Sequence, residues 1–405
     1  MVNMERVAYK KIIKELSFKN GKMAFITGPR QVGKTTLSEQ LLAEDKNGSY
    51  YNWDDVEFRR KWIKDPKAFI PETIGEKKLI VFDELHKAPR WKSYLKGLYD
   101  TRKEFCNILV TGSARLDIFR KGGDSLLGRY FLFRLHPFSL GELCNSDTEP
   151  EKLKQCLEEV ITANQLIYQD LMKYGGFPDA FLKKDQNFLN AWQRMRRDRV
   201  IREDLIDLTK THELSLIETA AALIPERIGS PFSIQSLAED LEVSHPTTKR
   251  WINWLSQLFY IYVIPPFNKK IARSLKKQPK IYLWDWSEIK DEAVKFENLV
   301  ASHLLKAAHF WTDSGIGTFD LYYLRDKEKK EVDFLMVKDK KPWLMVECKL
   351  NDVLPAPSLK YFSSLLAPEI TLQLVSKSGI HKLFDLNKNK KGYIISADQI
   401  LTLLP

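Results

Sequence analysis

The residues best suited to chemistry lie in a glycine-rich segment near the N-terminus. Gly28, Gly33, Lys34 and Thr35 follow the pattern GxxxxGK[ST] between an apolar run and an expected helix. In that context backbone amides surround an anion, the lysine reaches the β- and γ-phosphates, and the hydroxyl coordinates magnesium. The segment therefore predicts binding of ATP with Mg²⁺. The expected nucleotide-binding residues are Gly28, Pro29, Arg30, Gln31, Val32, Gly33, Lys34, Thr35 and Thr36.

A second apolar run, Leu79 to Phe82, ends in the carboxylates Asp83 and Glu84. Ligand crevices of open α/β sheets lie at this edge of the strands, so the pattern indicates a Walker B motif. Asp83 is expected to join Thr35 in the magnesium shell, and Glu84 to polarise the attacking water, which predicts hydrolysis. For Glu84 a solvated helix cap is the alternative.

The third apolar run ends in two hydroxyls, Thr111 and Ser113, either of which could sense the γ-phosphate. Arg129 precedes a further strand, at a position from which an arginine finger could reach a neighbouring subunit's site. Arg115 and Arg134 compete for that role, and an ordinary surface arginine remains open. Lys34, Glu84, Thr111, Ser113 and Arg129 form the predicted catalytic set of this part of the chain.

The C-terminal part contains a second set of charged residues, with Glu297 on an expected helix, Asp333 on one strand, and Glu347 and Lys349 on another. Glu347 and Lys349 point to one side of their strand, beside Asp333 if the strands form a hairpin. Asp333 and Glu347 are expected to hold a divalent cation, and Lys349 to activate water or stabilise phosphorane charge. Charged residues that solvate a strand edge are the alternative, and an Arg325–Glu331 ion pair stays undecided.

The segment from Pro231 to Trp251 resembles a helix-turn-helix, with Ser233 and Ser244 as expected N-caps. An aromatic strand and a Lys/Arg-rich stretch, 269–280, follow, as in a winged helix. The residues expected on the exposed side of the second helix are His245, Thr247, Thr248, Lys249, Arg250 and Asn253, whereas Trp251, Trp254 and Leu255 are expected in the core. Both DNA contact and packing against neighbouring elements remain open.

Length and composition limit the architecture. The 405 residues suit two or three domains, and 44% hydrophobic with 29% charged residues excludes a largely disordered chain. Alternating strands and helices predict an α/β unit, then helices from about 151 to 207, then further strands, with domains expected at 1–145, 146–279 and 280–405. The helix after the glycine-rich turn is expected to stop at Asn47-Gly48. In the C-terminal domain we expect a helix from Asp291 to Ala308 and strands at 320–324, 331–337 and 343–349. The net charge of +11 favours an anionic partner.

The sequence also carries expectations about cell location. The longest apolar run, 258–266, is too short to span a bilayer, and the N-terminus lacks the apolar core of a secretion signal. The four cysteines are scattered, which argues against a zinc site or disulfide framework. We therefore expect a cytoplasmic protein without a membrane partner.

Together the segments GPRQVGKT, LIVFDE, VTGSA and LLGRYFLFRLHPFSLGEL resemble AAA+ superfamily ATPases of bacteria and archaea that carry a C-terminal domain of unknown function. The resemblance covers nearly the whole chain. It implies an α/β P-loop NTPase domain, a winged-helix region, and a domain similar to PD-(D/E)xK nucleases whose motif matches Asp333, Glu347 and Lys349. Glu297 matches the extra acidic residue that some of these nucleases carry on a helix, and the resemblance implies that it is a further ligand of the cation. It also implies assembly into homo-oligomers.

Two functions from different classes follow. The first is an Mg-ATP-dependent ATPase coupled to a nuclease-like module that binds DNA. The second is a nucleotide-controlled switch that binds a protein partner, with a catalytically inactive C-terminal domain.

Overall fold

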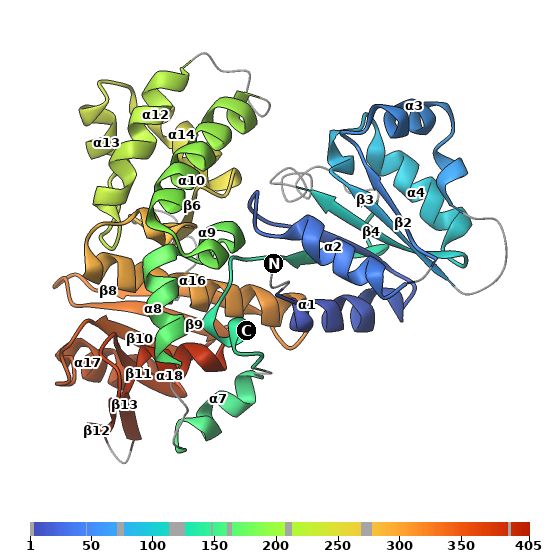
Figure 1. Cartoon of the computed structure of the whole chain (residues 1–405). Helices are drawn as coiled ribbons and strands as arrows, with labels where there is room; N and C mark the ends of the chain where they lie inside the picture. Colours follow the sequence, from blue (N-terminus) through green and yellow to red (C-terminus); the bar gives the residue numbers. More distant parts are fainter. Residues whose placement is uncertain are drawn as a thin grey trace. The chain divides into compact units, whose positions relative to one another are not determined.

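The structure is a computed structural model that describes residues 4–45, 47–70, 77–112, 126–146, 149–159, 164–206, 213–268, 278–387 and 390–405. The chain divides into two compact units, Met1–His136 and Pro137–Pro405. In Figure 1 the first unit runs from blue to cyan and the second from green to red.

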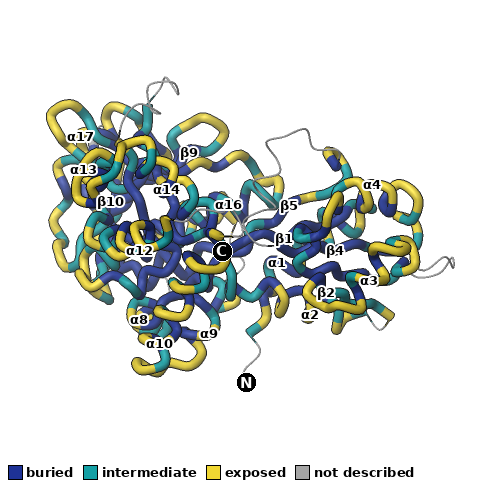
Figure 2. The backbone as a smooth tube through the Cα atoms, turned by 90° about the horizontal axis from the view of Figure 1, so that it is seen from above, coloured by how far each residue is buried: buried dark blue, intermediate teal, exposed yellow. Residues whose placement is uncertain are grey.

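The first unit is built on a parallel sheet with strand order β2-β3-β4-β1-β5. Its strands are β1 (Met23–Thr27), β2 (Ser49–Asn52), β3 (Lys78–Asp83), β4 (Cys106–Gly112) and β5 (Tyr130–Arg134). Four of them coincide with the predicted apolar runs, and the central ones are buried along their length (Figure 2). The edge strand β2 was not predicted, because its four residues are only half-buried and have no apolar run. The predicted parallel α/β unit is thus confirmed.

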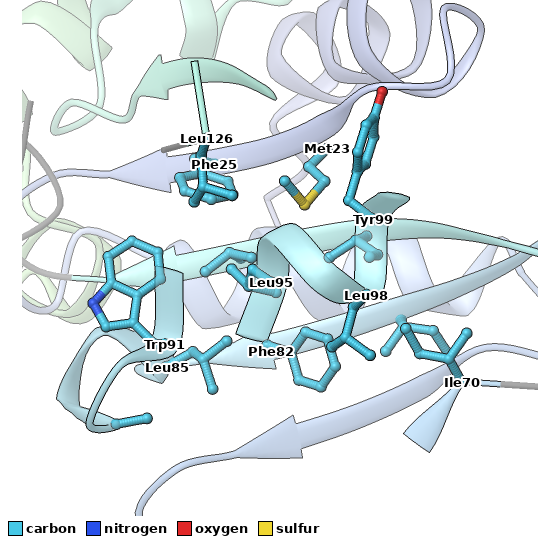
Figure 3. Close-up of a cluster of buried hydrophobic side chains, with 14 of the residues drawn as sticks. Met23, Phe25, Ile70, Phe82, Leu85, Trp91, Leu95, Leu98, Tyr99 and Leu126 are labelled. Atoms are coloured by element: carbon cyan, nitrogen blue, oxygen red, sulfur yellow. The ribbon is translucent and has the colours of Figure 1, made fainter. Parts of the chain in front are cut away.

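Helices cover this sheet and complete its core. They are α1 (Val7–Ile12), η1 (Ile13–Phe18), α2 (Lys34–Ala43), α3 (Val56–Lys64), η2 (Pro66–Phe69), η3 (Leu85–Lys87) and α4 (Trp91–Arg102). Helix α4 lays Trp91, Leu95 and Leu98 across the strands, where they meet Phe25 and Phe82 (Figure 3). Burial of each such side chain stabilises the fold by roughly 1.5 to 3 kcal/mol. This core fixes the strands whose ends carry the nucleotide motifs.

Helix α2 ends earlier than the sequence predicts. The expected stop was Asn47-Gly48, whereas the last helical residue is Ala43. Asp45 has left the helix, and its carboxylate accepts a hydrogen bond from the backbone N–H of Leu79 at 2.5 Å. The side chain therefore ties the end of α2 to the start of β3, which the local sequence does not reveal.

The second unit begins with helices, as predicted for 151–207. These are α6 (Leu140–Leu143), α7 (Pro150–Cys156), α8 (Gln165–Tyr174), α9 (Pro178–Lys183), α10 (Gln186–Asp198) and η5 (Arg199–Asp204). A second helical group comprises α12 (Leu214–Leu223), η6 (Ile224–Arg227), α13 (Ile234–Asp240) and α14 (His245–Gln257). Ser233 and Ser244 cap α13 and α14 by accepting backbone hydrogen bonds, as predicted.

An antiparallel pair, β6 (Ile261–Ile264) and β7 (Lys280–Leu283), follows α14. The sequence analysis placed the strand from Lys280 in the C-terminal domain, so the expected boundary at 279/280 separates two paired strands. The predicted basic stretch falls on 269–277, outside the described residues, except for its last residues.

The rest of the second unit is a sheet with strand order β12-β13-β11-β10-β9-β8. Its strands are β8 (Phe319–Arg325), β9 (Glu331–Lys338), β10 (Lys341–Lys349), β11 (Ile370–Val375), β12 (His381–Asn387) and β13 (Lys390–Ser396). Strands β8, β9 and β10 run antiparallel to one another, and β11 joins β10 in parallel. The three strands predicted between 320 and 349 are confirmed to within two residues.

The remaining helices of this unit are η7 (Trp286–Glu288), α16 (Glu292–Asp313), α17 (Pro357–Leu366), α18 (Ala397–Ile400) and η8 (Leu401–Leu403). Helix α16 packs against β8, β9 and β10 (Figure 1). Its first residue, Glu292, comes one residue after the predicted start at Asp291, which is the N-cap, and the helix runs five residues beyond the predicted end at Ala308.

A buried histidine joins α16 to the start of this unit. The Nε2 atom of His303 accepts a hydrogen bond from the N–H of Leu140 at 3.0 Å, and Nδ1 lies 2.8 Å from the carbonyl oxygen of Leu299. Burial lowers the pKa of His303 to about 4. The ring is therefore neutral in the folded protein at neutral pH, with a lone pair available to Leu140.

We predict that His303→Gln makes unfolding less sensitive to acid. Between the ordinary histidine pKa and about 4, the unfolded chain binds a proton that the folded chain excludes, so wild-type stability falls as the pH falls. Protonation of this single group lowers the free energy of unfolding by at most about 3 kcal/mol, and the glutamine variant does not undergo this loss. Urea unfolding at several pH values between 7 and 4 measures the difference. His245→Gln, on an exposed residue of α14, is the control and should follow the wild-type profile.

Candidate functional site

The glycine-rich loop leaves β1 and enters α2 with two unusual backbone conformations. Gly28 has φ 155°, and a Cβ there would lie 2.3 Å from the carbonyl oxygen of Leu135. Gly33 has φ 96° and precedes the first residue of α2. Only glycine accommodates both the close approach and the left-handed turn, so the loop reaches the helix N-terminus with its amides free to surround an anion.

Lys34 points back into the loop. Its side chain is buried, and its Nζ donates to the carbonyl oxygens of Gly28 at 3.0 Å and Pro29 at 2.8 Å. These neutral acceptors are weaker than phosphate oxygens, because hydrogen bonds between charged groups are stronger. The lysine is thus held at the loop that the sequence analysis assigned to the β- and γ-phosphates.

The other predicted nucleotide-binding residues occupy the same loop or the first turn of α2. Val32 is fully buried, Arg30 and Gln31 are half-buried, and Thr35 and Thr36 are exposed. Exposure leaves the two hydroxyls accessible to a ligand.

A buried arginine supports the loop from outside the motif. The guanidinium of Arg6 donates to the carbonyl oxygens of Val32 at 2.7 Å and His136 at 3.0 Å. Sequence reasoning missed Arg6, since its acceptors lie 26 and 130 residues further along the chain. Its position before α1 carries no signal that would have found it.

The carboxylate of Asp83 collects hydroxyl donors from three different elements. Thr35 Oγ1 lies 2.9 Å from Asp83 Oδ2, and Tyr50 OH on β2 lies 2.5 Å from the same oxygen. Thr111 Oγ1 on β4 donates to Oδ1. The parallel register explains this meeting, because Phe82 pairs with Val110, and the residues that follow them lie side by side. The structure therefore joins Thr35, Asp83 and Thr111, three of the predicted site residues.

Tyr50 was not among the predicted residues. Burial and the neighbouring Asp83 carboxylate raise the pKa of Tyr50, so the phenol stays protonated and donates. The sequence carries little indication of this role, because Tyr50 lies on an edge strand that is too short to predict.

The donor set fits a magnesium ion. Asp83 is almost completely buried and Thr35 is exposed beside it, so a hydroxyl and a carboxylate oxygen meet at the mouth of the loop. Oxygen ligands of this kind are what Mg²⁺ prefers, and it normally takes only one or two from the protein. Thr35 and Asp83 are the residues that would hold it.

Glu84 follows Asp83 in a left-handed conformation with φ 56°, which turns the chain sharply after β3. Its carboxylate lies 3.6 Å from the Nζ of Lys87 and 3.7 Å from Nε2 of His86. The side chain therefore stands at the predicted edge of the sheet, with a partner of opposite charge.

Arg129 is engaged within its own unit. Its guanidinium binds both carboxylate oxygens of Asp100 on α4, at 2.7 and 3.0 Å. This pairing lowers the pKa of Asp100. The structure does not bring Arg129 to the Asp83 cluster. The other candidates Ser113 and Arg115 lie outside the described residues.

The C-terminal set comes together on one hairpin and one helix. Strands β9 and β10 are antiparallel, with Phe334 opposite Val346, so Asp333 and Glu347 are neighbours. Lys349 Nζ lies 2.8 Å from Glu347 Oε1, and Asp333 Oδ2 accepts a hydrogen bond from the N–H of Cys348 at 2.9 Å.

A lysine that sequence reasoning missed lies among these carboxylates. Lys280 Nζ is 3.0 Å from Glu297 Oε1, 2.8 Å from Glu331 Oε1 and 3.2 Å from Asp333 Oδ1. Glu331 also pairs with Arg325 at 2.5 Å, which answers the question left open by the sequence. An ammonium thus occupies the space between Glu297 and Asp333, and a divalent cation does not fit there while Lys280 is present.

The pKa values of this cluster reflect burial of several carboxylates together. Burial and the charge of Asp333 raise the pKa of Glu297 to about 7, and the same two causes raise that of Glu347 to about 7. Burial alone would lower the pKa of Lys280, but Asp333, Glu297 and Glu331 outweigh it and raise this pKa. The ammonium is therefore charged across the physiological range.

Helix α14 presents a polar face. His245, Lys249, Arg250 and Asn253 are exposed, whereas Thr247 is half-buried. Trp251 and Leu255 are buried, as predicted, and Trp254 is half-buried.

The prediction that Thr248 is exposed is wrong. Its side chain is fully buried, and its hydroxyl donates to the carbonyl oxygen of Ser244 one turn earlier. Threonine fits a buried helix position when its hydroxyl bonds to the preceding turn.

Three family models match separate parts of the chain. An AAA domain matches residues 20–144, and two domains of unknown function, DUF8612 and DUF4143, match residues 165–287 and 295–395. The AAA match, the parallel sheet and the loop geometry together support a P-loop nucleotide-binding fold of the AAA class for the first unit, as predicted.

Similar proteins occur in bacteria and archaea. The chain is 23% identical to the uncharacterized protein Rv2008c of Mycobacterium tuberculosis over 94% of this chain and 81% of that protein. It is 21% identical to the uncharacterized protein MJ1544 of Methanocaldococcus jannaschii over 90% of this chain and 84% of that protein.

Solved structures are also similar to this chain. The Walker-type ATPase PABY2304 of Pyrococcus abyssi has 15% identity and a TM-score of 0.38 over 70% of this chain and 93% of that one. AMPPCP-bound DnaA from Aquifex aeolicus has 16% identity and a TM-score of 0.32 over 64% of this chain and 89% of that one.

Within the described ranges, no helix combines the length and the apolar character needed to cross a lipid bilayer.

We predict that Tyr50→Phe weakens the magnesium dependence of ATP binding. The change removes one of the donors that orient Asp83, worth about 1 kcal/mol, so the Mg²⁺ concentration for half-saturation should rise about fivefold. Fluorescent ATP titrated at several Mg²⁺ concentrations measures this, and binding in EDTA should not change. Tyr51→Phe, on a ring that stacks on Phe58, is the control. An unchanged Mg²⁺ dependence in the Tyr50 variant would contradict the assigned role.

Proposed function

We propose that the first unit binds Mg-ATP and hydrolyses it, and that its nucleotide state controls DNA binding by the second unit. The observation that carries the ATPase part is the hydrogen-bonded set of Thr35, Asp83 and Thr111 beside the loop that holds Lys34. A hydroxyl, a carboxylate and an ammonium at the carboxyl edge of a parallel sheet are the groups that phosphoryl transfer needs.

Each side chain has a separate role in this proposal. The loop amides and Lys34 bind the phosphates, with the ammonium exchanging its bonds to Gly28 and Pro29 for bonds to phosphate oxygens. Thr35 and Asp83 hold the metal. When bound, Mg²⁺ neutralises charge that develops on the phosphate oxygens. Thr111 keeps Asp83 oriented from the end of β4, where it would sense the γ-phosphate of a bound nucleotide.

Glu84 is the proposed base that orients the attacking water. It follows Asp83 at the strand end, and its carboxylate lies 3.6 Å from the Nζ of Lys87. Lys87 also binds Asp54 at 2.7 Å, so it can release Glu84 without losing every partner.

Arg129 is the proposed finger of a homo-oligomer. Its side chain is already extended at the surface in a bidentate bond to Asp100. Exchange of that carboxylate for a neighbouring subunit's γ-phosphate replaces one anion by another, which conserves the charge-assisted hydrogen bonds.

DNA binding is proposed for the second unit on the basis of α12, α13 and α14 and the β6–β7 pair. Helices followed by a two-stranded antiparallel sheet are typical of a winged helix-turn-helix. The exposed residues of α14 lie where such a helix meets the major groove, and the net charge of +11 favours an anionic partner.

The last sheet is proposed to be a domain of the PD-(D/E)xK type. The order α16, β8, β9, β10, α17, β11 places Asp333 and Glu347 on adjacent strands and Glu297 on the preceding helix. The alternative function, a switch that binds a protein partner through a catalytically inactive domain, is favoured by one observation, the ammonium of Lys280 among these carboxylates.

We predict that the purified chain hydrolyses ATP with Mg²⁺ and that DNA changes the rate. Lys34→Ala removes the ammonium that binds the phosphates and should reduce turnover by roughly 100-fold or more, since loss of such a group costs several kcal/mol. Phosphate release with and without single- and double-stranded DNA measures both effects.

The matched control for this test is Lys22→Ala, which lies just before β1 and whose Nζ bonds to the carbonyl oxygen of Gly128. It should retain wild-type turnover. Intact hydrolysis in the Lys34 variant would refute the ATPase assignment, and a rate insensitive to every DNA would favour the protein-partner switch.

A separate prediction concerns α14. Lys249→Ala should weaken binding to all DNA sequences alike and reduce the slope of log affinity against log salt by about 1, because one phosphate contact is lost. Fluorescence anisotropy across a salt series measures this slope. Lys382→Ala, on an exposed residue of β12, is the control. Equal slopes for the two variants would place the DNA contact elsewhere or exclude it.

A further inference from the structure

Lys280 lies in an unusual environment for a lysine. Its side chain is fully buried, and it enters the carboxylate cluster from β7, a strand outside the six-stranded sheet. The nitrogen is 2.8 to 3.2 Å from oxygens of Glu297, Glu331 and Asp333, which come from α16 and β9. An ammonium has three N–H donors, and three acceptors satisfy all of them. Every N–H group of the ammonium therefore has a carboxylate acceptor.

Neighbouring groups hold the arrangement in place. Tyr282, two residues further along β7, donates to Glu297 Oε1 at 2.7 Å. The ring of Tyr323 lies 5.7 Å from the Lys280 nitrogen, close enough for a cation–π contact. The Nζ atom of Lys280 therefore links strand β7 to helix α16 and to the six-stranded sheet.

Opposite charges in the cluster nearly balance. Four carboxylates, Glu297, Glu331, Asp333 and Glu347, face three cations, Lys280, Arg325 and Lys349. Arg325 neutralises Glu331, and Lys349 neutralises Glu347, so Lys280 is the cation that serves Glu297 and Asp333. Without it, two half-buried carboxylates would lack a counter-charge, which is unfavourable.

A divalent ion and this ammonium exclude each other. Mg²⁺ or Mn²⁺ binds oxygen at about 2.1 Å, so an ion shared by Glu297 and Asp333 would occupy the volume of the Lys280 nitrogen. Two positive charges at that separation repel strongly in a poorly solvated site.

We propose that Lys280 is a built-in cation that takes the place of a divalent metal ion in this carboxylate cluster. The cluster then joins β7 to the six-stranded sheet and does not support metal-dependent cleavage of a phosphodiester. This inference is independent of the proposed ATPase activity, because every residue involved lies in the second unit.

The test is to remove the built-in cation and supply a metal. Lys280→Ala in the full chain, without nucleotide, should lower Tm markedly. Millimolar Mn²⁺ should restore it by roughly 5 °C, and the wild-type Tm should not respond. Electron paramagnetic resonance should count one more bound Mn²⁺ in the variant than in wild type, and Lys280→Ala/Asp333→Asn should lose that ion.

Lys306→Ala is the matched control. Lys306 is also buried, but it binds one carboxylate, Glu142, together with the neutral oxygens of Ser139 and Pro137. Its removal should lower Tm without rescue by Mn²⁺, because one carboxylate and two neutral groups make a poorer site for a divalent cation than three carboxylates.

Two outcomes would overturn the proposal. One is a Lys280→Ala protein that folds and gains neither stability nor a bound ion with Mn²⁺. The other outcome can be observed even if the Lys280→Ala protein fails to fold, because it is measured on chains that retain Lys280. A Mn²⁺ ion bound to the nucleotide-free chain that is lost in Glu347→Gln would show that the cluster takes a metal with Lys280 present.

Discussion

The first unit depends on the buried carboxylate of Asp83. A carboxylate removed from water must be compensated, and here the compensation comes from the hydroxyls of Thr35, Tyr50 and Thr111. Those donors lie on α2, β2 and β4, so the hydrogen bonds form only when the parallel register of β3 and β4 and the end of the glycine-rich loop are all in place. The geometry of the predicted nucleotide site therefore depends on the correct fold of the sheet.

The two units compensate buried carboxylates in different ways, and the difference has a chemical consequence. Hydroxyl groups stabilise Asp83 without cancelling its charge, so the carboxylate still attracts a cation. The ammonium of Lys280 cancels charge at Glu297 and Asp333, and it also fills the space between them. Carboxylates at strand ends look alike in the sequence, but they differ in their ability to bind a metal ion. What decides this ability is whether another element supplies hydroxyl groups or an ammonium as the partner.

Sequence motifs predicted the contiguous parts of both sites. The strands β1, β3 and β4, the loop residues, Asp83 and the hairpin with Asp333 and Glu347 were found because their patterns lie within a few neighbouring residues. Arg6, Tyr50 and Lys280 were missed for a common reason. Each is an ordinary residue locally, and its role arises from partners far along the chain, such as Val32 for Arg6 and Asp333 for Lys280. The end of α2 was misplaced for the same reason, because Asp45 leaves the helix to bind the N–H of Leu79.

The position of Lys280 on β7 also bears on how the second unit is divided. A cut before residue 280 would assign β7 to the six-stranded sheet, yet its backbone pairs with β6 and the side chain of its Lys280 reaches Glu297 and Asp333. Strand β7 thus forms backbone hydrogen bonds with β6 of the helical part, and its Lys280 forms an ion pair with Asp333 of the six-stranded sheet. Separation of the two parts would leave either an unpaired strand or uncompensated carboxylates. A movement of α14 relative to the six-stranded sheet must therefore be small or must break this contact.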